Sequence, residues 1–322
     1  MMDFGMRFAG WWSAAAVYRD NRVIGITFLG ISSGFPLGIL GDPLTAWLQE
    51  SGLSKTSIGL FALVGLPYAL KFLWAPAFDR FCIPLVTDAF GRRRGWIIVS
   101  QIALLVCVWS LGFIELPGDI FLAAAVTLGV AFTSASQDIV IDAYRVEILA
   151  DDEQGAGAGT IVLGYRMGML SAGAGALWLA SALSWQQVYF IMGGLVVIGI
   201  IAVFIANEPE IKTIQQDKEA EKARIVLYMN RGIPLWFAKF LVWTNEGVVA
   251  PFKDFMTRSG WVCALAFIVL YKLGESYLGV MAGPFYVAIG FSTAEIANVT
   301  KLFGLGAIII GGLLGGIMVN QL

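Results

Sequence analysis

The sequence predicts an all-α membrane protein with about eight transmembrane helices. Three observations predict this fold class: the composition, a series of long apolar stretches, and basic residues confined to one side of them. Hydrophobic residues make up 58% of the 322 residues and charged residues only 14%, and the mean hydropathy is +0.78. A soluble domain carries roughly 25% charged residues. Lipid is therefore expected to be the solvent for most of the chain.

Eight apolar stretches are long enough to cross the hydrocarbon core of a bilayer, which takes roughly 20 helical residues. They lie near residues 22–41, 57–76, 96–115, 120–144, 158–182, 186–206, 260–282 and 296–319. Glycine is frequent, with 38 residues, and small residues allow membrane helices to approach closely. The pattern Gly164-x-x-x-Gly168 is accordingly predicted to be a close-packing face.

The basic residues indicate the orientation. With the N-terminus inside, the segments on the cytoplasmic side hold sixteen Lys and Arg residues, whereas the outer loops hold Lys55 alone. Cytoplasmic loops of membrane proteins carry an excess of positive charge. The sequence therefore predicts a multi-pass protein whose N-terminus is cytoplasmic.

The chain is predicted to divide into four segments. Residues 1–21 are a cytoplasmic N-terminal segment, and residues 22–206 are a transmembrane domain of six helices. Residues 207–259 are a cytoplasmic linker, in which residues 233–258 mix Trp, Phe and Lys as an amphipathic helix in the headgroup plane does. Residues 260–322 begin a second transmembrane domain with two helices. Six spans, a long inner linker and further spans are the layout of a two-half transporter.

An internal repeat supports this layout. Gly52-Leu-Ser-Lys-Thr-Ser-Ile58 and Gly290-Phe-Ser-Thr-Ala-Glu-Ile296 share the pattern G-[LF]-S-x-x-[SE]-I. Each opens a predicted span, and each follows a proline, Pro43 or Pro284, near the outer end of the previous span. Duplication of one half explains this placement. A second half built like the first would contain four more helices, so we expect a C-terminally truncated chain or a gene fragment.

The fourth predicted span carries the strongest group of intramembrane charges. Asp138, Asp142 and Arg145 are spaced i, i+4 and i+7 and share one helix face. Ionisable residues inside a bilayer are costly and usually functional. A carboxylate that takes up a proton is what a proton-coupled carrier without histidine needs. Asp138 is interpreted as a proton or substrate group. Asp142 has two interpretations, proton coupling or a gating or helix-cap salt bridge with Arg145.

Other spans carry single charges with two interpretations each. Arg166 is expected near the middle of the bilayer with Asp138 as its counter-ion, and a guanidinium suits a carboxylate or phosphate of a substrate. Lys272 and Glu275, spaced i, i+3, either neutralise each other or act in substrate binding and proton coupling. Lys71 either binds substrate or extends to the interface.

Asp42 lies in the break Gly41-Asp42-Pro43. It either lines an outer vestibule, where it would contact substrate, or caps a broken helix.

Several function classes are excluded by what the sequence lacks. The three cysteines are scattered and give neither a disulfide framework nor a metal site, and histidine, the commonest metal ligand, is absent. A membrane-embedded transferase would need a catalytic acid-base cluster and usually a DxD or histidine set. The glycine-rich residues 155–159 lack the Lys-Ser/Thr of a phosphate loop. We therefore expect no enzyme, cofactor, metal or nucleic acid.

The loop between the second and third spans contains a recognisable motif. It reads Asp79-Arg80 and, about ten residues later, Gly91-Arg92-Arg93-Arg94. This resembles the loop motif of major facilitator proteins, D-R-x-G-R-[RK], with an insertion between its two parts. Asp79 at a helix end can hold arginines of the loop and latch the outward-facing state. The chain resembles the AmpG family of muropeptide permeases, which share a wider group with acetyl-CoA transporters. The resemblance rests on this insertion and on residues 32–38, 67–76, 137–145 and 270–275.

This resemblance implies a major facilitator fold with a complete N-terminal six-helix half and the first two helices of the second. It implies a monomeric symporter that imports anhydro-muropeptides across the Gram-negative inner membrane for peptidoglycan recycling, driven by protons. Substrate carboxylates could meet Arg166, Lys71 and Lys272, and sugar rings could stack on aromatic side chains. The further candidates for substrate contact are Tyr144, Tyr165, Trp74, Gln137 and Asp42.

Two alternatives stay open at this point. One is a permease for another bulky anion such as acetyl-CoA. The other is a non-transporting interaction fragment, which would be favoured if the native gene stops at residue 322.

Overall fold

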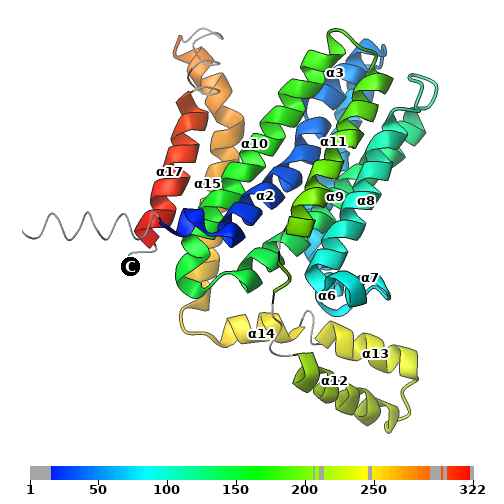
Figure 1. Cartoon of the computed structure of the whole chain (residues 1–322), viewed down its shortest axis with the longest axis vertical. Coiled ribbons are helices and arrows are strands. Elements are labelled where there is room, and N and C mark those ends of the chain that lie inside the picture. Colours follow the sequence, from blue (N-terminus) through cyan, green and yellow to red (C-terminus); the bar gives the residue numbers. More distant parts are fainter. Residues whose placement is uncertain are drawn as a thin grey trace, which may run out of the picture. The chain divides into compact units, whose positions relative to one another are not determined.

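A computed structural model describes residues 16–205, 207–209, 214–245, 249–290, 299 and 303–319. They form two compact units (Figure 1). The first unit comprises residues up to 210 together with residues from 309 onward, and the second lies between them, residues 211–308. Within the described part of the chain, helices are the only regular secondary structure. The all-α fold class is therefore confirmed, whereas the division into four domains stays a prediction.

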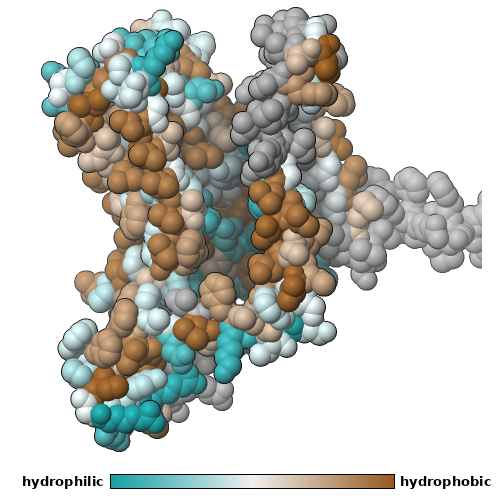
Figure 2. Space-filling view, turned by 180° about the vertical axis from the view of Figure 1, so that it is seen from behind, coloured by the Kyte–Doolittle hydropathy of each residue, from teal (hydrophilic) through white to brown (hydrophobic). Residues whose placement is uncertain are grey.

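Four long helices form most of the first unit. They are α8 (Arg92–Leu111), α9 (Ile120–Ile148), α10 (Gln154–Ala180) and α11 (Trp185–Ile205), and they pack with the N-terminal helix α2 (Asn21–Leu40). On the face seen in Figure 2, hydrophobic residues cover much of the middle of the first unit, and hydrophilic residues gather toward one of its ends. A short element precedes each of α2, α8 and α10: η1 (Ala16–Arg19), α7 (Val86–Phe90) and η4 (Asp151–Glu153), respectively.

Five stretches of the described residues are long and apolar enough to cross a membrane. They are Asn21–Glu50, Lys55–Leu73, Arg92–Leu111, Ile120–Ile148 and Trp185–Phe204. These agree with five of the eight predicted spans. Helix α10, with 27 residues, coincides with a sixth predicted span.

The first two spans differ from their predicted form. The first continues beyond residue 41, because α3 (Asp42–Glu50) follows α2 directly and Pro43 occupies a first-turn position that needs no N–H donor. The second is broken into short pieces around Pro67 and Pro76. These pieces are α4 (Lys55–Leu60), η2 (Phe61–Gly65), α5 (Leu66–Leu70), η3 (Lys71–Leu73) and α6 (Ala75–Arg80).

Helices α2 and α10 form the most intimate pair in the first unit. A Cβ atom at Gly34 would meet the backbone carbonyl of Tyr165, and one at Gly164 or Gly168 would meet carbonyls of α2. The close-packing face predicted on α10 is therefore present. Its partner face on α2, at Gly30, Gly34 and Gly38, was not predicted, although the same four-residue spacing marks it.

Replacing Gly34 with Ala is expected to destabilise the first unit by about 2 kcal/mol, because a methyl group there forces two backbones apart. Gly194→Ala on α11 is the matched control, since a Cβ atom there meets no atom within 4 Å. Thermal unfolding of both variants in detergent would measure this. Equal melting temperatures would contradict the close contact.

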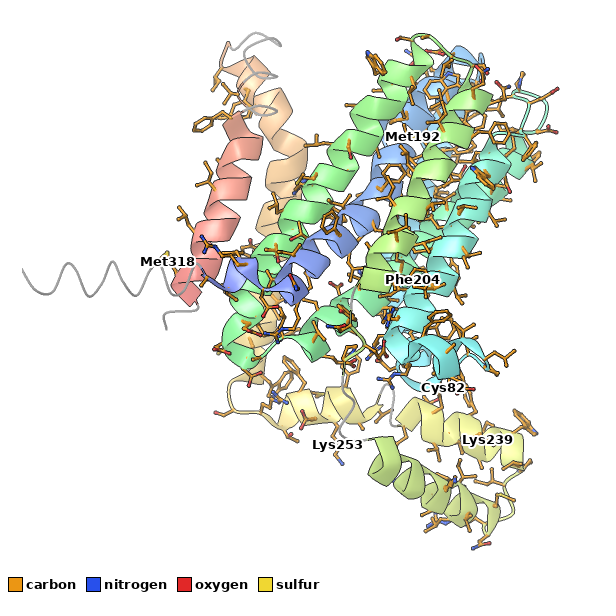
Figure 3. The ribbon with its side chains drawn as sticks, in the orientation of Figure 1. Cys82, Met192, Phe204, Lys239, Lys253 and Met318 are labelled. Atoms are coloured by element: carbon orange, nitrogen blue, oxygen red, sulfur yellow. The ribbon has the colours of Figure 1, made fainter. Side chains whose placement is uncertain are left out.

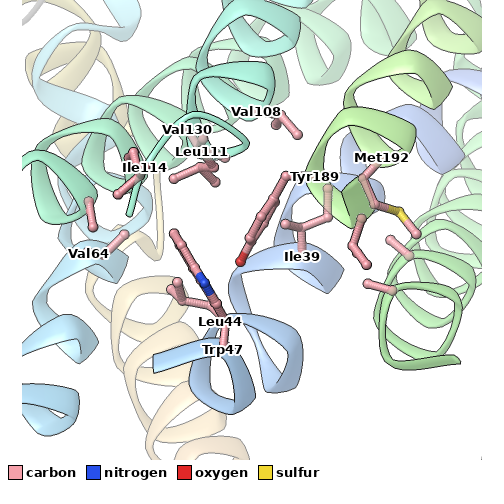
Figure 4. Packing of buried hydrophobic residues seen from close by; sticks show 14 of the residues in the cluster. Ile39, Leu44, Trp47, Val64, Val108, Leu111, Ile114, Val130, Tyr189 and Met192 are labelled. Carbon is pink, nitrogen blue, oxygen red and sulfur yellow. The ribbon is translucent and has the colours of Figure 1, made fainter. Parts of the chain in front are cut away.

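Two buried clusters hold the first unit together. One gathers near α3 and the ends of α8 and α11, where the Trp47 and Tyr189 rings meet edge to face with centroids 4.9 Å apart (Figure 4). The other lies at the opposite end of the long helices and includes Ile26, Ile97 and Tyr144. This second end, where α2 and α8 begin, is the predicted cytoplasmic end.

The second unit contains the linker helices and the start of the next spans. Its helices are α12 (Ile214–Met229), α13 (Leu235–Thr244), α14 (Ala250–Thr257) and α15 (Trp261–Ala288), and α17 (Gly304–Val319) follows. The repeat glycines Gly52 and Gly290 both have a left-handed backbone, with φ of 78° and 99°. This shared conformation supports the duplication. The remainder of the second copy, residues 291–296, lies outside the described residues.

Candidate functional site: a buried carboxylate and a charge cluster

Asp138 is the central polar group inside the first unit. It lies in the middle part of α9 and its residue surface is only 9% exposed. The Ser33 hydroxyl on α2 donates a hydrogen bond to Asp138 Oδ1 over 2.5 Å. Tyr68 on α5 and Tyr165 on α10 lie within electrostatic range of the same carboxyl group. Four segments therefore converge on one carboxyl group in the membrane interior.

A neighbouring layer of amides and hydroxyls lies deeper in the bundle. Ser32 Oγ accepts hydrogen bonds from the side-chain amides of Gln101 on α8 and Gln137 on α9, the latter over 3.1 Å. Gln137 is fully buried. It was predicted as a substrate contact, but here it ties α9 to α2 within the bundle.

Lys71 and Asp142 form an ion pair one helical turn from Asp138. Lys71 Nζ lies 3.8 Å from Asp142 Oδ2, and the two side chains are 35% and 58% exposed. A salt bridge with Arg145 was one of the two interpretations of Asp142. The described residues do not form it, because Lys71 in η3 reaches Asp142 from the second span. Arg145 instead donates to Gln154 Oε1 over 3.4 Å.

The expected pair of Arg166 with Asp138 is not formed. Both residues belong to the described part of the chain, and no ion pair joins them there. The helix period explains this: Gly164 and Gly168 face α2, and Arg166, two residues from each, is rotated to another side of α10. Arg166 is half-buried.

The other predicted substrate contacts are spread over the structure. Tyr144 is 2% exposed, and its hydroxyl donates to the Asn207 carbonyl over 2.8 Å, so it belongs to the cytoplasmic-end core. Trp74 donates to Ser136 Oγ over 3.2 Å and packs on α9. Asp42 is exposed in the first turn of α3, at the helix break.

Lys272 and Glu275 lie on α15, in the second unit. Lys272 is exposed, and the Glu275 side chain lies outside the described residues. Their roles stay predictions.

A second polar group, the charge cluster, lies at the predicted cytoplasmic end. We define it as Asp79, Arg93, Glu147 and Glu208. The Arg93 side chain is 4% exposed, with Nη1 2.8 Å from Asp79 Oδ1. Its guanidinium also binds both carboxylate oxygens of Glu147 on α9, with Nε 2.9 Å from Oε2. The predicted contact of Asp79 with an arginine of the loop is thus present.

Glu208 fastens the chain after α11 to the beginning of α8. Its carboxylate accepts hydrogen bonds from the backbone N–H groups of Arg93 and Arg94 over 2.9 and 3.0 Å. A helix N-terminus attracts such an anion. Gly91 permits the approach, because its φ is 87° and a Cβ atom there would collide with Glu208.

The remaining arginines of the loop act locally. Arg94 Nε donates to the Val203 carbonyl over 3.1 Å, near Phe204 at the end of α11 (Figure 3). Arg92 Nη1 donates to the Asp79 carbonyl over 2.5 Å. The Arg80 side chain lies outside the described residues.

A separate ion pair fastens the start of α2. Arg22 Nη2 lies 2.7 Å from Asp20 and 2.6 Å from Glu153. Hydrogen bonds from Arg22 lower the pKa of the Asp20 carboxyl below its ordinary value.

A bundle of long apolar helices with charges gathered at one end defines a multi-pass α-helical membrane protein. The chain belongs to the Major Facilitator Superfamily, whose profile matches residues 22–322, and within it to the AmpG transporters. It is 39% identical over 308 residues to the anhydromuropeptide permease of Escherichia coli (strain K12). That match covers 95% of this chain and 57% of the permease. A Rickettsia conorii protein named AmpG 4 is 36% identical over 309 residues, which cover 95% of this chain and 69% of that protein.

Proposed function

We propose that this protein is a proton-coupled symporter of the bacterial inner membrane that imports anhydromuropeptides into the cytoplasm for peptidoglycan recycling. The observation that supports it most is the buried Asp138 in a chain of the AmpG family. The N-terminus and the linker are cytoplasmic in this proposal. Because the chain spans 57% of the length of the Escherichia coli permease, transport by this chain itself is part of the proposal.

Asp138 is the proposed proton carrier. A neutral carboxylic acid costs far less to bury than a carboxylate ion, so a proton can reside on Asp138 inside the bundle. Loss of that proton would create a buried negative charge. The Ser33 hydroxyl and the nearby Lys71 ammonium are the groups placed to stabilise it.

The substrate is proposed to bind near the membrane midplane, as in other transporters with repeated halves. A muropeptide carries peptide carboxylates and sugar rings. Arg166 and Lys71 in the first unit are the proposed partners of the carboxylates. Lys272 on α15 is a further candidate, considered by itself. Tyr165, which is half-buried and near Asp138, is the proposed stacking partner for a sugar ring.

Uptake by proteoliposomes tests this function directly. The purified chain is reconstituted, a proton gradient is imposed, and entry of a radiolabelled anhydromuropeptide is followed with and without an uncoupler. We expect uncoupler-sensitive uptake that unlabelled muropeptide competes away and acetyl-CoA does not. Competition by acetyl-CoA would favour the bulky-anion alternative. Absence of uptake beside an active Escherichia coli permease would show that this chain does not transport.

The pair of Lys71 and Asp142 is expected to assist the cycle. Asp142→Asn should slow uptake about two- to fivefold, since a partly exposed ion pair contributes about 0.5–1 kcal/mol. Lys71→Gln should slow uptake more, because it also removes the proposed contact with a substrate carboxylate. The double variant should be no slower than Lys71→Gln, because the ion pair is already lost in that variant. Initial rates in proteoliposomes give the comparison. Additive losses would show that the two groups act independently.

A further inference from the structure

The linker helix α13 carries a continuous row of aromatic rings. Trp236 and Phe237 have centroids 5.4 Å apart, Phe237 and Phe240 are stacked at 6.2 Å, and Phe240 and Trp243 are stacked at 6.2 Å. We call these four residues the aromatic row. Trp236 is 72% and Phe240 52% exposed. So much exposed aromatic surface on a helix of ten residues marks an interaction site.

The aromatic row lies on the side of α13 away from its buried residues. Helix α13 packs along α12, and the residues that it buries are Ala238 and Val242. At 100° per residue, Trp236, Phe240 and Trp243 are spaced i, i+4 and i+7 and centre opposite Ala238 and Val242. Packing within the linker hairpin therefore leaves Trp236 and Phe240 exposed, whereas Trp243 at the end of the row is half-buried.

Positive charge accompanies the aromatic rings. Residues 222–258 contain six Lys and Arg residues against two acidic residues, Glu246 and Asp254. Asp254 is neutralised by Arg258, whose Nη2 lies 2.8 Å away. Lys239 on α13 and Lys253 on α14 are both exposed (Figure 3). A cationic helix with aromatic residues on one face is typical of binding to an anionic lipid surface.

Helix α14 repeats this pattern next to a transmembrane helix. Phe252 and Met256, spaced i, i+4, are 64% and 52% exposed. The helix ends at Thr257, and the apolar helix α15 begins at Trp261. Four residue steps span at most about 14 Å. The lipid surface around α15 is therefore within reach of α14, and the five residues 245–249 connect α14 to α13.

We propose that the aromatic row of α13, together with Phe252 and Met256 of α14, docks on the anionic lipid surface beside α15. The rings enter the headgroup region, and Lys239, Lys253 and neighbouring arginines bind phosphate groups of the lipids. The linker that joins the two halves is thereby held flat on the bilayer. This inference concerns the linker alone and does not depend on the substrate or on proton coupling.

A fluorescent label at Thr244 tests the docking in the complete chain. Thr244 lies near the aromatic row and can be replaced by Cys without removing a ring, after the three native cysteines are changed to Ser. The protein is placed in nanodiscs of phosphatidylcholine with or without phosphatidylglycerol. With the anionic lipid, we expect a blue-shifted emission and at least twofold quenching by spin-labelled lipid. A label at Lys222→Cys, on exposed α12, should show neither change and is the matched control.

The double substitution Trp236→Ser/Phe240→Ser should abolish the lipid quenching at position 244, and high salt should weaken it. An unchanged melting temperature confirms that this variant is folded. Quenching that is equal without phosphatidylglycerol would overturn the anionic specificity. No lipid quenching at position 244 would overturn the docking. A signal that requires two protein copies per disc would also overturn it and would identify a second copy of this chain as the partner of the row.

Discussion

Asp138→Asn is expected to abolish uncoupler-sensitive uptake while leaving the protein folded and inserted. The amide has nearly the same shape and can still accept the hydrogen bond from Ser33, so the contact between α2 and α9 persists. The amide cannot bind and release a proton, so the proton gradient can no longer drive substrate uptake. Uptake of labelled muropeptide under an imposed proton gradient measures the effect.

Substrate exchange gives the sharper comparison. Exchange of external for internal muropeptide at equal concentrations needs no net proton movement, so Asp138→Asn proteoliposomes should retain it. Asp142→Asn, one turn along α9 and exposed, is the control and should remain uncoupler-sensitive with a modest loss of rate. Unchanged gradient-driven uptake in Asp138→Asn would reject Asp138 as the proton carrier.

Arg93→Gln is expected to lower the free energy of unfolding by about 3 kcal/mol. Removing one member of a buried ion pair leaves its partners without compensation and costs roughly 3–5 kcal/mol. The lower end applies, because Asp79 and Glu147 are 53% and 31% exposed and water can solvate them in part. Melting temperature in detergent and the rate of proteolysis report the change.

A matched arginine provides the control for this prediction. Arg258 also binds a carboxylate, Asp254, at 2.8 Å, but both side chains are exposed, at 72% and 65%. Arg258→Gln should change stability by less than about 0.5 kcal/mol. If the two substitutions had equal effects, the burial of Arg93 would have no energetic consequence.

The sequence alone predicts the helices of the first unit well. A long apolar stretch is expected to enter the bilayer, and there a helix satisfies all the backbone hydrogen bonds of the segment. Helices α8 and α11 begin within four residues of their predicted starts at 96 and 186. The second span is the exception. Its prolines at positions 67 and 76 break it into short helices, but its hydropathy is that of one continuous span. Proline within an apolar run was the signal that could have predicted this.

The site was predicted in part. Asp138 could be predicted as a site residue because it is an ionisable residue within an apolar span. Asp79 and Arg93 could be predicted because they belong to the loop motif. Glu147 and Glu208 were missed, because they approach Arg93 from positions 54 and 115 residues away, and no local pattern reports such a meeting. The same cause explains why Lys71 was missed as the partner of Asp142: Arg145 is near in sequence, whereas Lys71 is near in space.

The contact between α2 and α10 has a mechanical consequence. Their backbones touch at Gly34, Gly164 and Gly168 without side chains between them, so neither helix can slide or twist without breaking many contacts at once. We therefore expect α2 and α10 to move together as one rigid body. We expect flexing of this half to occur instead in the segmented stretch Lys55–Leu73, which is the least buried of the five apolar spans and carries Lys71, the partner of Asp142 on α9.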